Sequence, residues 1–160
     1  MAMPIIRLET PINAPPERCF DLARDVGVHT ASAARTRERA VAGVTSGLLG
    51  HGDTVTWEAV HVGVRQRLTA RITRFERPVL FEDEMVRGAF RSFTHTHEFR
   101  SAGAGTLMVD TFRYESPLGL LGMLADKLFL ERYMRRFLAD RATFLKRVAE
   151  ADERATRLGR

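Results

Sequence analysis

The sequence predicts an α+β domain in which a curved antiparallel β-sheet of about six to seven strands wraps around one long C-terminal α-helix. Two observations lead to this prediction. Between about residues 39 and 115, polar and apolar residues alternate in successive segments that short turns separate. After Pro117 and Gly119 the apolar residues instead recur with the spacing of an amphipathic helix.

The first elements are a strand and two short helices. Residues 4–12 alternate, with Ile6, Leu8 and Thr10 on one side. The sequence Asn-Ala-Pro-Pro at 13–16 ends this strand, and we expect Asn13 to cap a helix over residues 17–23. A second short helical piece is expected over residues 28–34.

Six further strands follow as hairpins, over residues 39–44, 53–61, 64–75, 79–85, 89–100 and 106–115. Because the turns between them are short, neighbouring strands should be antiparallel. One long helix can cover only one face of such a sheet, and a sheet that curls around the helix encloses an internal space.

Residues 120–149 have the pattern of the long helix, which would measure roughly 45 Å at a rise of 1.5 Å per residue. One domain therefore covers residues 1–150, and residues 151–160 are expected to be a frayed tail. The apolar, glycine-rich segment 116–123 is a gate at the mouth of the cavity, a patch for lipid or partner contact, or a tight connection that buries its leucines. Residues 43–52 are a second candidate rim.

Composition excludes several classes of function. The chain has 160 residues, of which 44 % are hydrophobic, but no stretch reaches the roughly 20 apolar residues that span a bilayer. The formal net charge is +5, and the basic residues are interleaved with acidic ones, so we expect no nucleic-acid partner. With Cys19 alone no intramolecular disulfide can form. Because Met1 to Thr10 lacks a basic region followed by an apolar block, we expect no signal peptide and a cytoplasmic location. Phosphate-binding glycine loops, serine-hydrolase elbows and paired-cysteine motifs are absent from the sequence.

Several motifs resemble those of one superfamily. They are Phe81-Glu-Asp-Glu84, Arg87-Gly-Ala-Phe90, Phe93-Thr-His-Thr-His-Glu-Phe99, Gly105-Thr-Leu-Met-Val-Asp110, Tyr114-Glu-Ser-Pro-Leu-Gly119 and, in the helix, Tyr133-Met-Arg-Arg-Phe137 followed by Arg141. With the order of elements, they are similar to the SRPBCC superfamily of START-like, helix-grip proteins, which includes polyketide cyclases, and above all to its bacterial ligand-binding family. The resemblance implies the helix-grip fold. It also implies a cavity for a hydrophobic molecule or, in some members, cyclisation or dehydration of polyketides. The family often has Pro at the position of Ala89 and usually Trp at that of Phe93.

His95 and His97 lie two residues apart on one strand and therefore face the same side of the sheet. Three interpretations stay open. The histidines could bind a metal with Asp83 or Asp110, a His–Asp pair could move protons, or Asp83, His95, Asp110 and Arg141 could form a buried polar network. We favour the network, because Arg141 on an apolar helix stripe needs a carboxylate partner. Neither a metal nor a cofactor is predicted.

Strand parity and helix spacing give the candidate ligand-binding residues. They are Val55, Trp57, Gln66, Leu68, Ala70, Phe93, His95, His97, Met108, Asp110, Phe112, Tyr114, Met134, Phe137, Leu138 and Arg141. All would face the space between sheet and helix, and any of them could instead be ordinary core.

The predicted function is binding of a small hydrophobic molecule of lipid, polyketide or aromatic type, by a monomer or homodimer without stable membrane insertion. One alternative is a cyclase or dehydratase-like enzyme, for which His95, His97 and Asp110 are the candidate catalytic residues. Another is a protein-interaction domain with a collapsed cavity.

Overall fold

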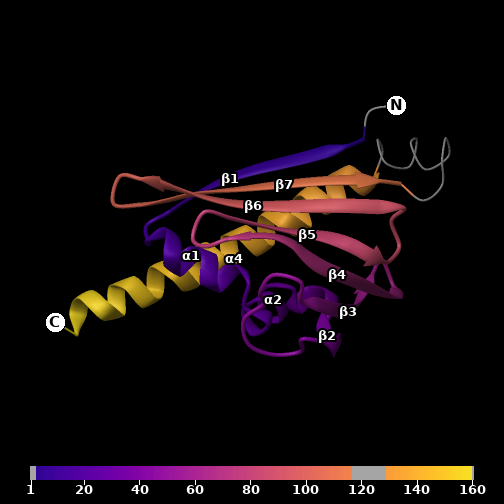
Figure 1. The fold of residues 1–160 in the computed structure, drawn as a ribbon, viewed down its shortest axis with the longest axis horizontal. Helices are drawn as coiled ribbons and strands as arrows, with labels where there is room; N and C mark the ends of the chain where they lie inside the picture. Colours follow the sequence, from indigo (N-terminus) through magenta and orange to yellow (C-terminus); the bar gives the residue numbers. More distant parts are fainter. Residues whose placement is uncertain (1–2, 117–128, 160) are drawn as a thin grey trace.

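A seven-stranded antiparallel sheet and one long helix dominate the computed structural model, which describes residues 3–116 and 129–159 (Figure 1). The strands are β1 (Ile5–Ile12), β2 (Arg39–Gly43), β3 (Thr54–His61), β4 (Val64–Glu76), β5 (Leu80–Arg87), β6 (Ser92–Ala102) and β7 (Gly105–Glu115). Their order across the sheet is β1-β7-β6-β5-β4-β3-β2, so consecutive strands pair as hairpins except that β1 joins the far edge beside β7.

The described helices are α1 (Pro16–Ala23), α2 (Val26–Ser32), the short 3₁₀-helix η1 (Ala34–Thr36) and α4 (Glu131–Leu158). In Figure 1, α4 runs obliquely along the sheet, and its C-terminal end projects beyond the strands. It packs against β1, α1 and α2. This arrangement confirms the predicted fold class, a curved antiparallel sheet around a C-terminal helix.

The start of α1 differs from the prediction. Its N-cap is Pro15, which makes no side-chain capping hydrogen bond, so Asn13 is not the cap. Two successive prolines fix the extended entry and the first helical turn without a capping side chain. The backbone N–H of Asn13 instead donates to Glu150 Oε1 on α4 at 3.0 Å, which ties the end of β1 to the long helix.

The long helix also extends further than its apolar pattern indicates. The predicted frayed tail at residues 151–160 is helical as far as Leu158. Ion pairs explain the extension, since Arg18 pairs with Asp152, and Lys146 contacts Glu150 at 3.2 Å. The C-terminal end of α4 projects beyond the sheet (Figure 1) and therefore needs no apolar stripe. The spacing of apolar residues for this reason does not predict that the helix continues. The predicted helix start at residue 120 and residues 117–123 of the proposed gate lie outside the described residues.

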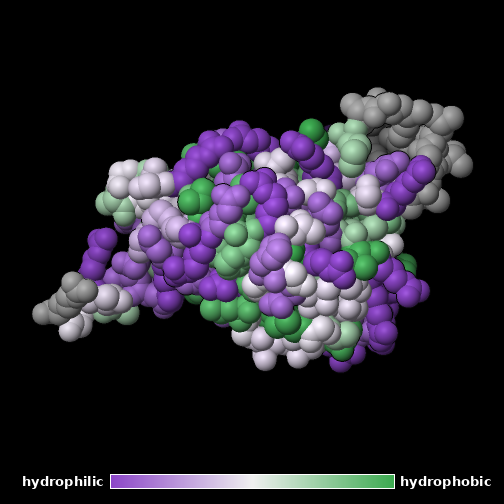
Figure 2. Space-filling view, viewed as in Figure 1, coloured by the Kyte–Doolittle hydropathy of each residue, from purple (hydrophilic) through white to green (hydrophobic). Residues whose placement is uncertain are grey.

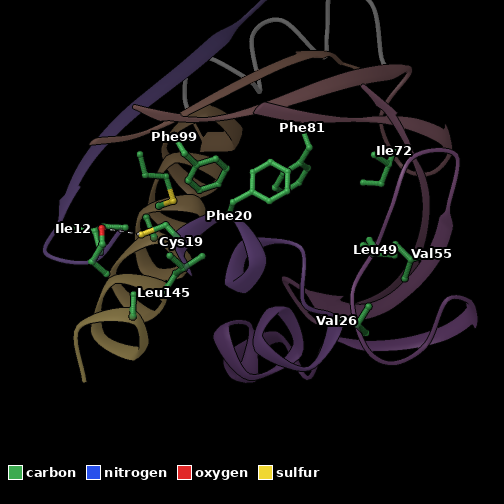
Figure 3. Packing of buried hydrophobic residues seen from close by; sticks show 14 of the residues in the cluster. Ile12, Cys19, Phe20, Val26, Leu49, Val55, Ile72, Phe81, Phe99 and Leu145 are labelled. Atoms are coloured by element: carbon green, nitrogen blue, oxygen red, sulfur yellow. Dashed lines mark hydrogen bonds between the residues drawn. The ribbon is translucent and has the colours of Figure 1, made fainter. Parts of the chain in front are cut away.

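Phe20 on α1 is the centre of the larger hydrophobic cluster (Figure 3). Its ring meets Phe75, Phe81 and Phe99 edge-on at centroid distances of 5.3, 5.3 and 5.4 Å. Such edge-to-face contacts add to the gain from burial alone. A second cluster gathers around Phe112, Tyr114 and Met134 towards the start of α4.

Polar side chains cover most of the face seen in Figure 2, with scattered apolar ones between them. Many of the arginines have acidic partners: Arg39 and Arg67 both bind Glu58, and Arg77 binds Asp21. Part of the positive charge is thus neutralised locally. Among the helices described here, none is long and apolar enough to cross a bilayer.

Candidate functional site

A cavity of about 440 Å³ lies between the inner face of the sheet and α4. Its wall combines members of both hydrophobic clusters, including Trp57 and Phe81 from the first and Phe112 and Met134 from the second. Side chains therefore do not fill the space that the curved sheet encloses. Cavities that bind small molecules commonly measure about 300–1,000 Å³ and are lined in this way.

Most of the residues chosen by parity and helix spacing line this cavity: Val55, Trp57, Gln66, Leu68, Ala70, Phe93, His95, His97, Phe112, Met134, Phe137, Leu138 and Arg141. Three do not. Met108 and Asp110 line a smaller neighbouring cavity of about 40 Å³, and Tyr114 is fully buried in the second cluster. As expected, all three side chains lie on the buried face of β7. The cavity of about 440 Å³, however, does not extend to them.

Four polar side chains from three neighbouring strands form one hydrogen-bonded network on this inner face. His97 on β6 lies between two carboxylates, with Nε2 at 3.0 Å from Asp83 Oδ1 and Nδ1 at 3.0 Å from Asp110 Oδ1. His95 Nε2 lies 3.2 Å from the same Asp110 oxygen. Strand register produces this arrangement, because Asp83 pairs with His95 across β5 and β6, and His97 pairs with Asp110 across β6 and β7.

These contacts set the charge of each histidine. Burial disfavours the charged form of His97, but its hydrogen bonds to Asp110 and Asp83 outweigh burial and raise its pKa to about 9. Burial alone would raise the pKa of Asp110, yet hydrogen bonds from His95 and His97 hold it well below its usual range. Burial, together with the charge on His97, lowers the pKa of His95.

At neutral pH, His97 is therefore an imidazolium that donates from both nitrogens. His95 is neutral and donates its Nε2 proton to Asp110. Its Nδ1 is then an acceptor, and it has no hydrogen-bond partner among the described residues. His95 borders the cavity, and this nitrogen keeps its lone pair available as an acceptor.

A second polar group lines another part of the cavity wall. Arg141 on α4 donates from Nη2 to His29 Nδ1, and His29 Nε2 donates to Glu38 Oε1. The His29 ring stacks on Trp57 at a centroid distance of 3.8 Å. Burial, aided by the positive charge of Arg141, lowers the pKa of His29 to about 4, so the ring is neutral at pH 7.

This second group corrects the predicted placement of Arg141. The sequence predicts Arg141 in one network with Asp83, His95 and Asp110, whereas in the structure it hydrogen-bonds to His29. The carboxylate that balances its charge is Glu38, which it reaches through the imidazole. The reason is the packing of α4 against α2, the helix that carries His29.

The mouth of the cavity carries a third polar contact and exposed apolar side chains. His61 Nδ1 lies 2.7 Å from Tyr133 Oη, which joins the end of β3 to α4. Beside it, Val62, Val64 and Phe129 are 67 %, 57 % and 53 % exposed, although all three border the cavity. Val62 also has a positive φ of 51°, which a β-branched residue adopts only at a cost in energy.

Sequence reasoning did not find His29, Glu38, His61 or Tyr133 as site residues. His29 and Glu38 belong to a short helix and an irregular segment, where no period assigns a direction to a side chain. For His61, one sequence signal was available in the adjoining two-residue turn Val62-Gly63. Such turns usually have Asn or Gly at the first position, so a Val there marks this turn as unusual.

The sheet curled around one C-terminal helix, with a cavity between them, defines a helix-grip protein. The chain matches, over residues 3–150, the family described as polyketide cyclase / dehydrase and lipid transport, and it belongs to that family. The resemblance to the SRPBCC superfamily that the motifs indicate is thereby confirmed. No curated protein matches the chain significantly.

Solved structures share the fold over almost the whole chain. TTHA0849 from Thermus thermophilus is 25 % identical, with a TM-score of 0.77 over 93 % of this chain and 99 % of that chain. Ms6760 from Mycobacterium smegmatis is 16 % identical, with a TM-score of 0.69 over 92 % of each chain. Major latex-like protein 151 from Panax ginseng is 14 % identical, with a TM-score of 0.70 over 93 % of this chain and 99 % of that chain.

Proposed function

We propose that the protein binds a small, largely apolar molecule of lipid, polyketide or aromatic type, as a cytoplasmic carrier, sensor or scavenger. The observation that carries this proposal is the cavity of about 440 Å³, with its mainly aromatic and aliphatic wall. Release of water from such a wall and from the ligand supplies the driving force. The description of the family, which combines polyketide chemistry with lipid transport, supports the same class of ligand.

The polar groups in the wall would orient the bound molecule. Neutral His95 offers an acceptor at Nδ1, which suits a phenolic or enolic hydroxyl group on the ligand. Gln66 on β4 also lines the cavity and could pair with either a donor or an acceptor. We therefore expect ligands with one hydroxyl group at the end of an apolar body to bind better than pure hydrocarbons.

Trp57 provides a direct assay, because it is the single tryptophan and part of the cavity wall. Its fluorescence would be titrated with a long-chain fatty acid, a flavonol and a hydroxylated anthraquinone. The variant Ala70→Phe puts a ring into the cavity, and Arg71→Phe puts the same ring on the outer face of β4 as a control. The proposal expects at least tenfold weaker binding in Ala70→Phe alone. Equal binding in both variants, or no response of the wild type to any probe, would contradict it.

A second candidate function is acid–base catalysis of the cyclase or dehydratase type, which the free Nδ1 of His95 favours. That nitrogen could take a proton from the carbon between two ketone groups, with Asp110 stabilising the imidazolium that forms. The open cavity argues against the other alternative, an interaction domain with a collapsed cavity.

Proton abstraction can be tested without knowledge of the natural substrate. Exchange of the central protons of 1-phenylbutane-1,3-dione in D₂O would be followed by NMR. Catalysis predicts faster exchange with the wild type and with His51→Gln, a change at an exposed histidine outside the cavity, and the background rate with His95→Gln. If the wild type leaves the background rate unchanged, the proposal reduces to binding alone.

A further inference from the structure

The inner-face network contains a group of ligand atoms with the spacing of a metal site. One ring nitrogen each of His95 and His97 and a carboxylate oxygen of Asp83 all lie within 4.8 Å of one another. Within residues 3–116 and 129–159, this is the one group of three or more such side chains that meets this spacing. From these atoms we propose that Asp83, His95 and His97 bind a divalent first-row transition metal ion.

The sheet fixes the three side chains before any ion arrives. His95 and His97 share the inner face of β6, and Asp83 lies opposite His95 on β5. Ligand atoms around a tetrahedral Zn²⁺ lie about 3.3–3.6 Å apart, because the bonds measure about 2.0–2.2 Å. The pair His97 Nε2 and Asp83 Oδ1 lies at 3.0 Å, and the ligand nitrogen of His95 lies within 4.8 Å of the other ligand atoms, so small side-chain shifts would bring all three to these distances.

Asp110 takes the role that a supporting carboxylate has in metal sites. Its Oδ1 accepts from His97 Nδ1 at 3.0 Å and from His95 Nε2 at 3.2 Å. One carboxylate thus holds both rings and leaves the opposite nitrogen of each for an ion. Histidines that bind metals are commonly oriented by such a second hydrogen bond.

Charge and access agree with an ion at this position. Asp83 and Asp110 bring two carboxylates into the protein interior, and one divalent cation would balance both. The ion would replace the proton that His97 shares with Asp83. Two imidazoles and one carboxylate suit Zn²⁺ with an open position, and all three ligands border the large cavity, so that position would face it.

The test titrates chelator-treated full-length protein with Zn²⁺ in a calorimeter and with Co²⁺ in an absorption cell, without any organic ligand. We expect one ion per chain and the visible bands of four- or five-coordinate Co²⁺. Affinity should fall at least tenfold in Asp83→Asn, His95→Gln and His97→Gln, and about 10–100-fold in Asp110→Asn through the loss of ring orientation. His51→Gln, which changes an exposed histidine in the loop before β3, is the control and should bind as the wild type does.

Failure of the wild type to bind either ion at micromolar concentration would overturn the proposal, whatever the folding of the variants. Equal affinity in the wild type and in folded His97→Gln, with folding checked by circular dichroism, would overturn it as well. Because the titration contains no organic ligand, its result is independent of whether the cavity binds an apolar molecule.

Discussion

Acid should destabilise this protein in part through the buried histidine His29. Folding lowers its pKa to about 4, against a value of about 6.5 for an unfolded chain. Between these values the unfolded chain binds the proton and the folded one does not, so stability falls as the pH falls. For a change from pH 7 to pH 5 the two pKa values give a loss of about 2 kcal/mol. The charged groups that act on the His29 ring are Glu38, Arg141 and Asp83, and Trp57 stacks on its face.

The assay is urea unfolding at pH 7 and pH 5, followed by circular dichroism. His29→Gln keeps hydrogen-bonding capacity towards Glu38 and Arg141 but removes the titration. The control His51→Gln changes an exposed histidine in the loop before β3. We expect the pH-dependent loss to be about 2 kcal/mol smaller in His29→Gln than in the wild type or the control. The same loss in all three proteins would refute the assigned role of His29.

Three further substitutions test other parts of the structure. Arg141→Leu removes the cation beside His29 and Glu38, so the free energy of unfolding in urea should fall by about 2 kcal/mol; an unchanged pH–stability profile would contradict the contact. Phe20→Ala opens a gap among three aromatic rings and should cost about 3–5 kcal/mol by the same assay; a loss below about 1 kcal/mol would be inconsistent with this core. Val62→Asn relieves a positive φ at an exposed position and should stabilise by about 1 kcal/mol; a lower Tm would contradict that cost.

Strand parity predicts much of the site because adjacent positions on a strand face opposite sides. His95 and His97 are buried on the inner face together with Phe93 and Phe99, as the period of two requires. Parity also gives Asp110 its inward direction. It cannot tell which inward side chains border free space, and for that reason it does not separate Met108 and Tyr114 from the true lining residues.

Residues outside regular elements cannot be placed in the same way. His29 reaches the cavity from the short helix α2, and Glu38 from the segment before β2, so their contact depends on the tertiary path of the chain. The apolar stripe indicates that Arg141 needs a partner, but that partner is far away in sequence and is an imidazole. The helix α4 extends to Leu158 because ion pairs stabilise its last turns. A hydrophobic pattern contains no information about such pairs.

Native mass spectrometry of protein purified from its own host most directly tests whether the cavity holds a ligand. We expect a mass shift from one mainly apolar organic molecule on the wild type and on Arg71→Phe, with little or none on Ala70→Phe. A bare protein mass in all three, combined with no Trp57 response to the probe set, would show that the space between sheet and helix is not a ligand site.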